Sequence, residues 1–148
     1  ELAMSSCAAA ASAAFLWLAA GPQDLPREPP APPAAVALEP LFADIVARAK
    51  ALKAEAASLR GGAATDHFRQ GVKDLSDLDM KGHIVLAERK TDGDLKCILK
   101  GISEDLPLKL QALDEARDPK ARKEALEDMT YLLNDNVEVL TAPPAPAV

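Results

Sequence analysis

The sequence predicts an all-α protein, folded as an antiparallel, up-down-up-down four-helix bundle. Three observations lead to this fold class. Between Leu41 and Thr141 apolar residues recur at three- and four-residue spacing, breaker-rich connections divide this stretch into four, and the apolar content comes mainly from Ala and Leu. Such spacing places apolar side chains on one face of a helix, and Ala and Leu favour helix over sheet. Short connections then make consecutive helices antiparallel neighbours.

The first helix is expected over residues 41–60 and the second over residues 66–90. Two glycines at 61–62 end the first. Thr65 or Asp66 caps the second, because a short polar side chain at this position accepts a hydrogen bond from an unpaired backbone N–H. The apolar stripe of the first helix consists of Leu41, Ile45, Ala49, Leu52, Ala56 and Leu59, and that of the second of Phe68, Val72, Leu75, Gly82 and Leu86.

The third helix is expected over residues 94–117. Its pattern contains Pro107, which has no N–H to bond the carbonyl four residues before it, so a kink is expected near residues 103–106. Its apolar stripe consists of Leu95, Ile98, Leu99, Ile102, Leu106, Leu110 and Leu113.

The fourth helix is expected over residues 119–141. Asp118 followed by Pro119 supplies an N-cap and a proline at the first helical position, a combination that favours helix initiation. Its apolar stripe consists of Leu126, Met129, Leu133, Val137 and Leu140. Asn134, Asp135 and Asn136 are poor helix formers in its last turns, and they predict a polar end of the bundle.

Outside the bundle, assigned to residues 40–141, the sequence predicts three further segments. Residues 22–39 are rich in proline and are expected to form an extended tether, because proline fixes φ and removes backbone donors. Residues 142–148 are expected to be a flexible Pro-rich tail. Residues 1–21 form an Ala-rich segment that resembles a signal peptide or an anchor.

The signal-like interpretation rests on residues 8–20, an uncharged apolar run as long as a signal-peptide core and too short to span a bilayer comfortably. Small residues follow it, as at a cleavage site, although no Lys or Arg precedes it. The interpretation places the protein in the periplasm or at a membrane, with membrane association through residues 8–20. The alternative is a cytoplasmic protein whose Ala-rich run is a helix packed on the bundle or on a partner.

Composition argues against a nucleic-acid partner. The net charge of −6 disfavours contact with phosphates, and aromatic residues, which could stack on bases, make up only 3% of the chain. Phosphate-binding Gly-rich loops, zinc-ligand spacings and serine nucleophile elbows are absent from the sequence.

Asp79 and His83 are the candidate polar core pair. Both fall at or near the apolar stripe of the second helix, one turn apart. A buried carboxylate and imidazole could bind a metal or titrate near neutral pH, which gives the alternative of a small enzyme using these two residues. The simpler interpretation is a local ion pair of these two residues, or a wetter stretch of the bundle where Asp79 meets a Lys or Arg of another helix. It is favoured because a metal site needs three or four ligands and only His67 offers a second imidazole.

A haem-binding bundle is the other carrier hypothesis. Covalent haem attachment would need a Cys-x-x-Cys-His run, which neither cysteine has. For a haem held by two side chains, His83 and Met129 would be about 10 Å out of register. No cofactor and no metal are therefore expected.

The outer side of the third helix is the candidate interaction face. Cys97, Gly101 and Leu108 lie there, away from the apolar stripe, and Gly101 permits close approach of another helix. The Ala-rich run or another subunit could cover this face. A disulfide between Cys7 and Cys97 would fit an oxidising compartment, but cleavage of a signal would remove Cys7, so the pairing stays open.

The sequence thus favours a non-catalytic binding or structural protein of the cell envelope that acts through protein-protein contacts. Its expected partner is another protein or a second copy of the chain. A metal- or haem-binding four-helix carrier and a small enzyme are the alternatives.

Overall fold

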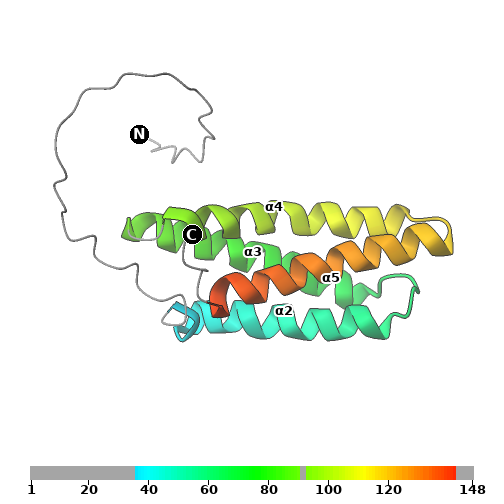
Figure 1. Ribbon diagram of the computed structural model, residues 1–148, viewed down its shortest axis with the longest axis horizontal. Coiled ribbons are helices and arrows are strands. Elements are labelled where there is room, and N and C mark those ends of the chain that lie inside the picture. Colours follow the sequence, from blue (N-terminus) through cyan, green and yellow to red (C-terminus); the bar gives the residue numbers. More distant parts are fainter. Residues whose placement is uncertain (1–35, 91–92, 143–148) are drawn as a thin grey trace, which may run out of the picture. The chain divides into compact units, whose positions relative to one another are not determined.

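The computed structural model describes residues 36–90 and 93–142, which contain four α-helices and no strand (Figure 1). The helices are α2 (Pro40–Ser58), α3 (Asp66–Arg89), α4 (Gly93–Glu115) and α5 (Pro119–Thr141). Each begins and ends within about two residues of its predicted bounds. The all-helical class and the four helices are therefore confirmed. The signal-like segment with Cys7, the tether up to residue 35 and residues 143–148 lie outside the described residues.

The starts of α3 and α5 follow from short polar side chains. Thr65 Oγ1 accepts a hydrogen bond of 3.0 Å from the backbone N–H of Phe68. Asp118 Oδ1 accepts from the N–H groups of Lys120 and Ala121, at 3.0 and 2.9 Å. These contacts satisfy donors that a helix leaves unpaired in its first turn, and they confirm the predicted caps.

The four helices lie lengthwise beside one another (Figure 1). The backbones of α2 and α3, α3 and α4, α4 and α5, and α2 and α5 come close together. Within the described residues, no such approach links α2 to α4 or α3 to α5. The helices thus form a ring around a shared core, with two diagonal pairs.

Apolar side chains from all four helices fill the core. The largest fully buried ones are Phe42, Ile45, Phe68, Val72, Leu75, Leu86, Leu99, Leu106, Leu113, Met129, Leu133 and Leu140. Burial of one such side chain contributes roughly 1.5 to 3 kcal/mol to folding, which makes this core the main source of stability. None of the described helices is both long and apolar enough to cross a membrane.

The last residues of the predicted tether belong to the bundle. Val36 is buried against the core, and Glu39 precedes α2. Glu39 pairs with Arg89 of α3 through contacts of 2.8 and 2.6 Å, and the guanidinium lies 5.9 Å from the centre of the Phe42 ring. These contacts hold the residues directly before α2 against the bundle.

Pro107 lies inside α4 without ending it. A proline has no N–H, so the carbonyl of Ser103, four residues earlier, lacks its helical donor. Ser76 Oγ of α3 donates a hydrogen bond of 2.7 Å to this carbonyl. A neighbouring helix thus supplies the missing donor, and the contact joins α3 to α4.

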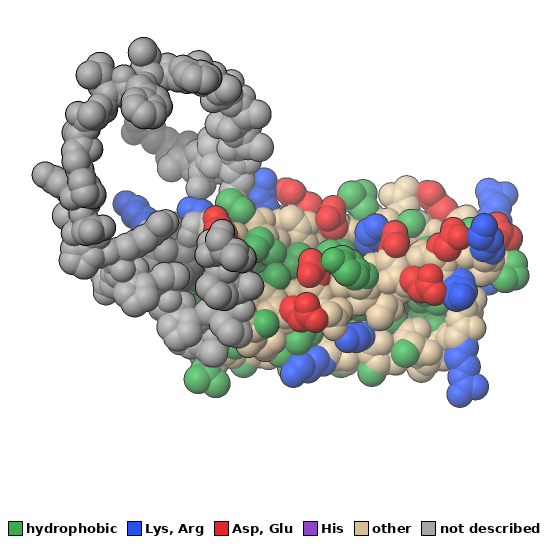
Figure 2. Space-filling view, viewed as in Figure 1, with side chains coloured by type: hydrophobic (Ala, Val, Ile, Leu, Met, Phe, Trp, Pro, Cys, Tyr) green, Lys and Arg blue, Asp and Glu red, His purple; other side chains and the backbone are tan. Residues whose placement is uncertain are grey.

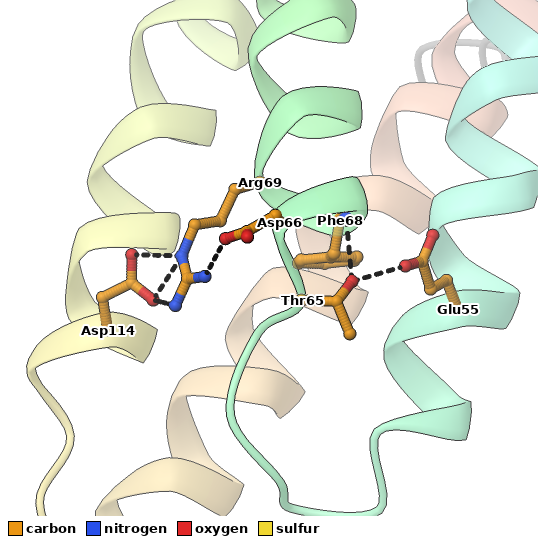
Figure 3. A network of polar contacts seen from close by, with 6 residues as sticks. All are labelled: Glu55, Thr65, Asp66, Phe68, Arg69 and Asp114. Carbon is orange, nitrogen blue, oxygen red and sulfur yellow. Dashed lines mark hydrogen bonds and ion pairs between the residues drawn. The ribbon is translucent and has the colours of Figure 1, made fainter.

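A polar network joins α2, α3 and α4 where α3 begins (Figure 3). Arg69 donates to both carboxylate oxygens of Asp114 at 2.9 to 3.2 Å and to Asp66 at 2.9 Å. Thr65 Oγ1, which caps α3, also donates to Glu55 of α2 at 3.0 Å. The ion pairs are at least partly exposed, and water screens them, so they add little to stability. Their main effect is to fix how these helix ends meet.

Candidate functional site

The most unusual polar contact joins Asp79 of α3 to Asn136 of α5. Both side chains are fully buried, and Asn136 Nδ2 donates a hydrogen bond of 2.6 Å to Asp79 Oδ2. The two helices form a diagonal pair, so this hydrogen bond crosses the core of the bundle. Within the described residues, Asp79 Oδ1 and Asn136 Oδ1 are buried oxygens without a hydrogen-bond partner.

Burial raises the pKa of Asp79 to about 8, because a carboxylate loses its hydration in the core; the hydrogen bond from Asn136 acts in the opposite direction. A carboxyl group with such a pKa keeps its proton at neutral pH. In that state it can donate as well as accept a hydrogen bond.

His83 has a different partner from Asp79. It is buried one turn further along α3, and its Nδ1 lies 2.7 Å from the backbone carbonyl of Lys96 in α4. Because a carbonyl only accepts, Nδ1 carries the proton. The sequence suggested that Asp79 and His83 form one polar pair, or that Asp79 meets a cation of another helix. Within the described residues, Asp79 instead bonds the neutral Asn136 of α5, and His83 bonds the backbone of Lys96 in α4.

The described residues contain no group of three or more His, Cys, Asp and Glu side chains arranged to hold a metal ion. The second imidazole, His67, lies at the start of α3 and contacts Glu55 Oε2 at 3.0 Å through Nδ1. It is exposed and is not brought to His83. Met129 lies in the apolar core.

The predicted interaction face lies on α4. Leu108 is 60% exposed, whereas Cys97 and Gly101 are half-buried. A Cβ atom placed on Gly101 would meet nothing within 4 Å, so this side of the helix has room for an approaching chain. The assignment of this face as an interaction surface stays a prediction.

A groove of about 480 Å³ lies between the end of α2 and residues 123–134 of α5. Its lining consists of Lys53, Ala56, Ala57, Arg60, Gly61, Lys123, Leu126, Glu127, Thr130, Tyr131 and Asn134. Buried Ala56 and Leu126 supply apolar surface, and Tyr131 stands beside them with 72% of its surface exposed. Charges of both signs are interspersed over the face in view in Figure 2, where α5 and α2 lie next to each other.

Positive charge predominates within the groove. Glu127, the one carboxylate in its lining, pairs with Lys123 at 3.6 Å. Lys53 Nζ donates to the side-chain oxygen of Asn134, which is neutral. Arg60 has no ion pair with another residue of the described part. Among the described residues no carboxylate therefore compensates the charges of Lys53 and Arg60, in a chain whose net charge is −6.

Arg60 also has an unusual backbone. Its φ of +47° is in the left-handed region, and Gly61 follows with a φ of +79°. A non-glycine residue in this region costs roughly 1 to 2 kcal/mol, because Cβ approaches a carbonyl oxygen. The chain thus holds an arginine at the mouth of the groove in a position where glycine would be more stable.

Comparison with protein-family models gives no match, and neither curated proteins nor solved structures give a significant one.

Sequence reasoning missed Asn136 as a core residue and did not find the groove. Asn136 follows Leu133 by three residues and precedes Leu140 by four, so helical spacing already placed it on the apolar stripe. The adjacent Asn134 and Asp135 concealed that signal, because the three polar residues together suggest an exposed helix end. The groove depends on how α2 and α5 pack, which no local pattern reveals.

Proposed function

We propose that this chain is a non-catalytic binding protein that recognises an acidic segment of a partner protein through the groove between α2 and α5. The observation that carries the proposal is the uncompensated pair of cations, Lys53 and Arg60, beside apolar surface. Arginine and exposed aromatic residues are enriched where proteins bind one another. The groove therefore suits a segment that presents carboxylates together with apolar side chains.

The dimensions of the groove favour a chain segment. Lys53 lies in the last two turns of α2, and Arg60 lies two residues past its end. Two carboxylates a few residues apart on a partner can reach both cations, while an apolar side chain between them contacts Ala56, Leu126 and Tyr131. A second copy of this acidic chain is one such partner, which keeps the homo-oligomer within the proposal.

The architecture and location predicted from the sequence belong to the same proposal. The ring of helix contacts and the short connections support an up-down-up-down bundle. The apolar run at residues 8–20 supports a location in the cell envelope. The carrier and enzyme alternatives depend on Asp79 and His83, whose described hydrogen bonds are to protein groups.

A synthetic peptide in which Glu alternates with Leu tests the groove, with a Lys-Leu peptide as the charge-reversed control. The full chain is titrated with each peptide while backbone amide resonances are recorded by NMR. We expect the acidic peptide to shift resonances of groove residues in the wild type. It should bind Arg60→Gly or Lys53→Gln roughly two- to fivefold more weakly than the wild type.

Lys90→Gly serves as the matched control, because Lys90 is also a cation with a left-handed backbone, at the far end of α3. It should leave the affinity unchanged. Equal binding of both peptides, or resonance shifts spread away from α2 and α5, would refute the groove as the binding site. A protein that associates with itself through the groove would lose its dimer in Arg60→Gly and keep it in Lys90→Gly.

A further inference from the structure

The buried contact between Asp79 and Asn136 joins two helices that do not touch through their backbones. Elsewhere in the described core, α3 and α5 are separated by apolar side chains. Among the described residues, this is the hydrogen bond that directly joins the diagonal pair α3 and α5. A change in its strength acts on how α3 and α5 are held together.

The surroundings of Asp79 contain no buried cation. The buried polar side chains of the described residues are Asp79, His83, Ser103 and Asn136. On α3, His83 donates to Lys96 O of α4; on α4, Ser103 Oγ donates to the carbonyl of Lys100. The buried residues of α2 are all apolar, and α5 contributes Asn136. Charged side chains of the neighbouring helices, including Lys96 and Lys100, are at least partly exposed.

The two buried oxygens without partners belong to the same pair. An ionised carboxylate only accepts hydrogen bonds, and so does the side-chain oxygen of Asn136. With Asp79 ionised, both Asp79 Oδ1 and Asn136 Oδ1 lack a donor, and a buried polar atom without a hydrogen-bond partner destabilises the fold. One proton on Asp79 Oδ1 supplies a donor for the Asn136 oxygen and satisfies both atoms.

We propose that Asp79 is a neutral carboxylic acid that forms a ring of two hydrogen bonds with Asn136, and that loss of its proton weakens the link between α3 and α5. In the ring, Asn136 Nδ2 donates to Asp79 Oδ2, and Asp79 Oδ1 donates to Asn136 Oδ1. On deprotonation the Oδ1–H bond breaks and the proton passes to water. A buried negative charge then faces an amide oxygen, and one hydrogen bond remains.

The raised pKa agrees with this assignment. A pKa of about 8 makes the link intact at neutral pH and weakened in mildly alkaline solution. The bundle therefore contains a proton-dependent contact at its centre, independent of the groove.

The side-chain carbon resonance of Asp79 in the full-length wild-type chain provides the direct test. We expect its NMR titration to have a midpoint near the pKa of about 8, well above the ordinary value of 3.8 for aspartate. A midpoint in the ordinary range of aspartate would overturn the proposal, because Asp79 would then be ionised at neutral pH.

Amide hydrogen exchange tests the effect on the helices. Asp79→Asn retains both hydrogen bonds of the ring, because its amide can donate to Asn136 Oδ1, but it has no proton to lose. When α5 opens, Asp79 meets water and releases its proton at any pH above its ordinary pKa of 3.8, so opening becomes easier as the pH rises towards about 8. From about two units below the pKa of about 8 to one unit above it, the exchange rate of α5 amides around Asn136 in the wild type, relative to Asp79→Asn, should therefore rise by up to about a hundredfold.

Comparison at the same pH removes the intrinsic pH dependence of exchange. Asp77→Asn is the control, since it removes the same charge from an exposed position two residues away. It should exchange like the wild type at both pH values. An exchange rate of the wild type, relative to Asp79→Asn, that stays the same at both pH values would show that the proton does not control the link, and would overturn that part of the proposal.

Discussion

Ser76 of α3 donates to the carbonyl of Ser103, the acceptor in α4 that Pro107 leaves without a helical donor. A side chain of α3 thus replaces the backbone hydrogen bond that α4 lacks at Pro107. Ser76→Ala should lower the free energy of unfolding by about 1 to 3 kcal/mol, because a half-buried hydroxyl bond is lost and a buried carbonyl is left unpaired. Denaturant unfolding measures this change.

Pro107→Ala provides the matched test, because alanine has a backbone N–H that can donate to the carbonyl of Ser103. In that background Ser76→Ala should cost less, with a coupling free energy of about 0.5 to 2 kcal/mol in the double-mutant cycle. Additive effects would mean that Ser76 does not replace the missing backbone donor.

The pH dependence of stability follows from Asp79. Its pKa is about 8 in the folded protein and 3.8 as the ordinary value. Between these values the folded state holds a proton that the unfolded state has released. The stability contributed by this proton is therefore fully present below the ordinary pKa and is lost as the pH rises through about 8.

Asp79→Asn should remove this dependence. Within that window the wild type should lose stability relative to Asp79→Asn by about 1.4 kcal/mol per pH unit, the effect of one proton. The difference between the two proteins isolates Asp79 from other titrating groups, and urea unfolding at several pH values measures it. Parallel stability profiles would contradict the raised pKa.

Much of the fold was predictable because its signals are local. Apolar spacing, the caps Thr65 and Asp118, and Pro119 set the helix bounds through interactions within a few residues. Asp79 was recognisable as a core residue for the same reason. Its partner was not, because Asn136 lies 57 residues away and is chosen by the packing of diagonal helices.

The groove was less predictable still. Lys53, Arg60 and Tyr131 each resemble ordinary surface residues in the sequence, and only the packing of α2 on α5 brings them together. The sequence carries a weak signal of the left-handed backbone at Arg60, namely the two glycines that follow it. Glycines at this point indicate a helix end but do not reveal that the arginine itself adopts the strained conformation.

Replacement of Arg60 by glycine should separate stability from binding. Glycine adopts a positive φ without strain, and this gain exceeds the entropy that glycine adds to the unfolded chain. Arg60→Gly and Lys90→Gly, with φ values of +47° and +59°, should each raise the free energy of unfolding by up to about 1 kcal/mol. Of the two variants, only Arg60→Gly should bind the acidic peptide more weakly than the wild type. A loss of stability in Arg60→Gly would show that the arginine stabilises the fold.

Gly82 and Gly101 should respond in opposite directions to the same substitution by alanine. Both are inside helices, where alanine is favoured by about 1 kcal/mol. A Cβ on Gly101 meets nothing within 4 Å, so Gly101→Ala should gain up to about that amount. A Cβ on Gly82 would lie 3.1 Å from Leu99 Cδ1, 3.2 Å from Phe42 Cε1 and 3.3 Å from Ile45 Cδ1.

These three neighbours of Gly82 are fully buried and come from two other helices, so they have little room to move apart. Overpacking of a core costs about 1 to 3 kcal/mol, which exceeds the helical gain. Gly82→Ala should therefore lower the free energy of unfolding by up to about 2 kcal/mol. Guanidinium unfolding of the two variants measures the contrast, and a stabilised Gly82→Ala would show that α2 and α4 can separate at this point without loss.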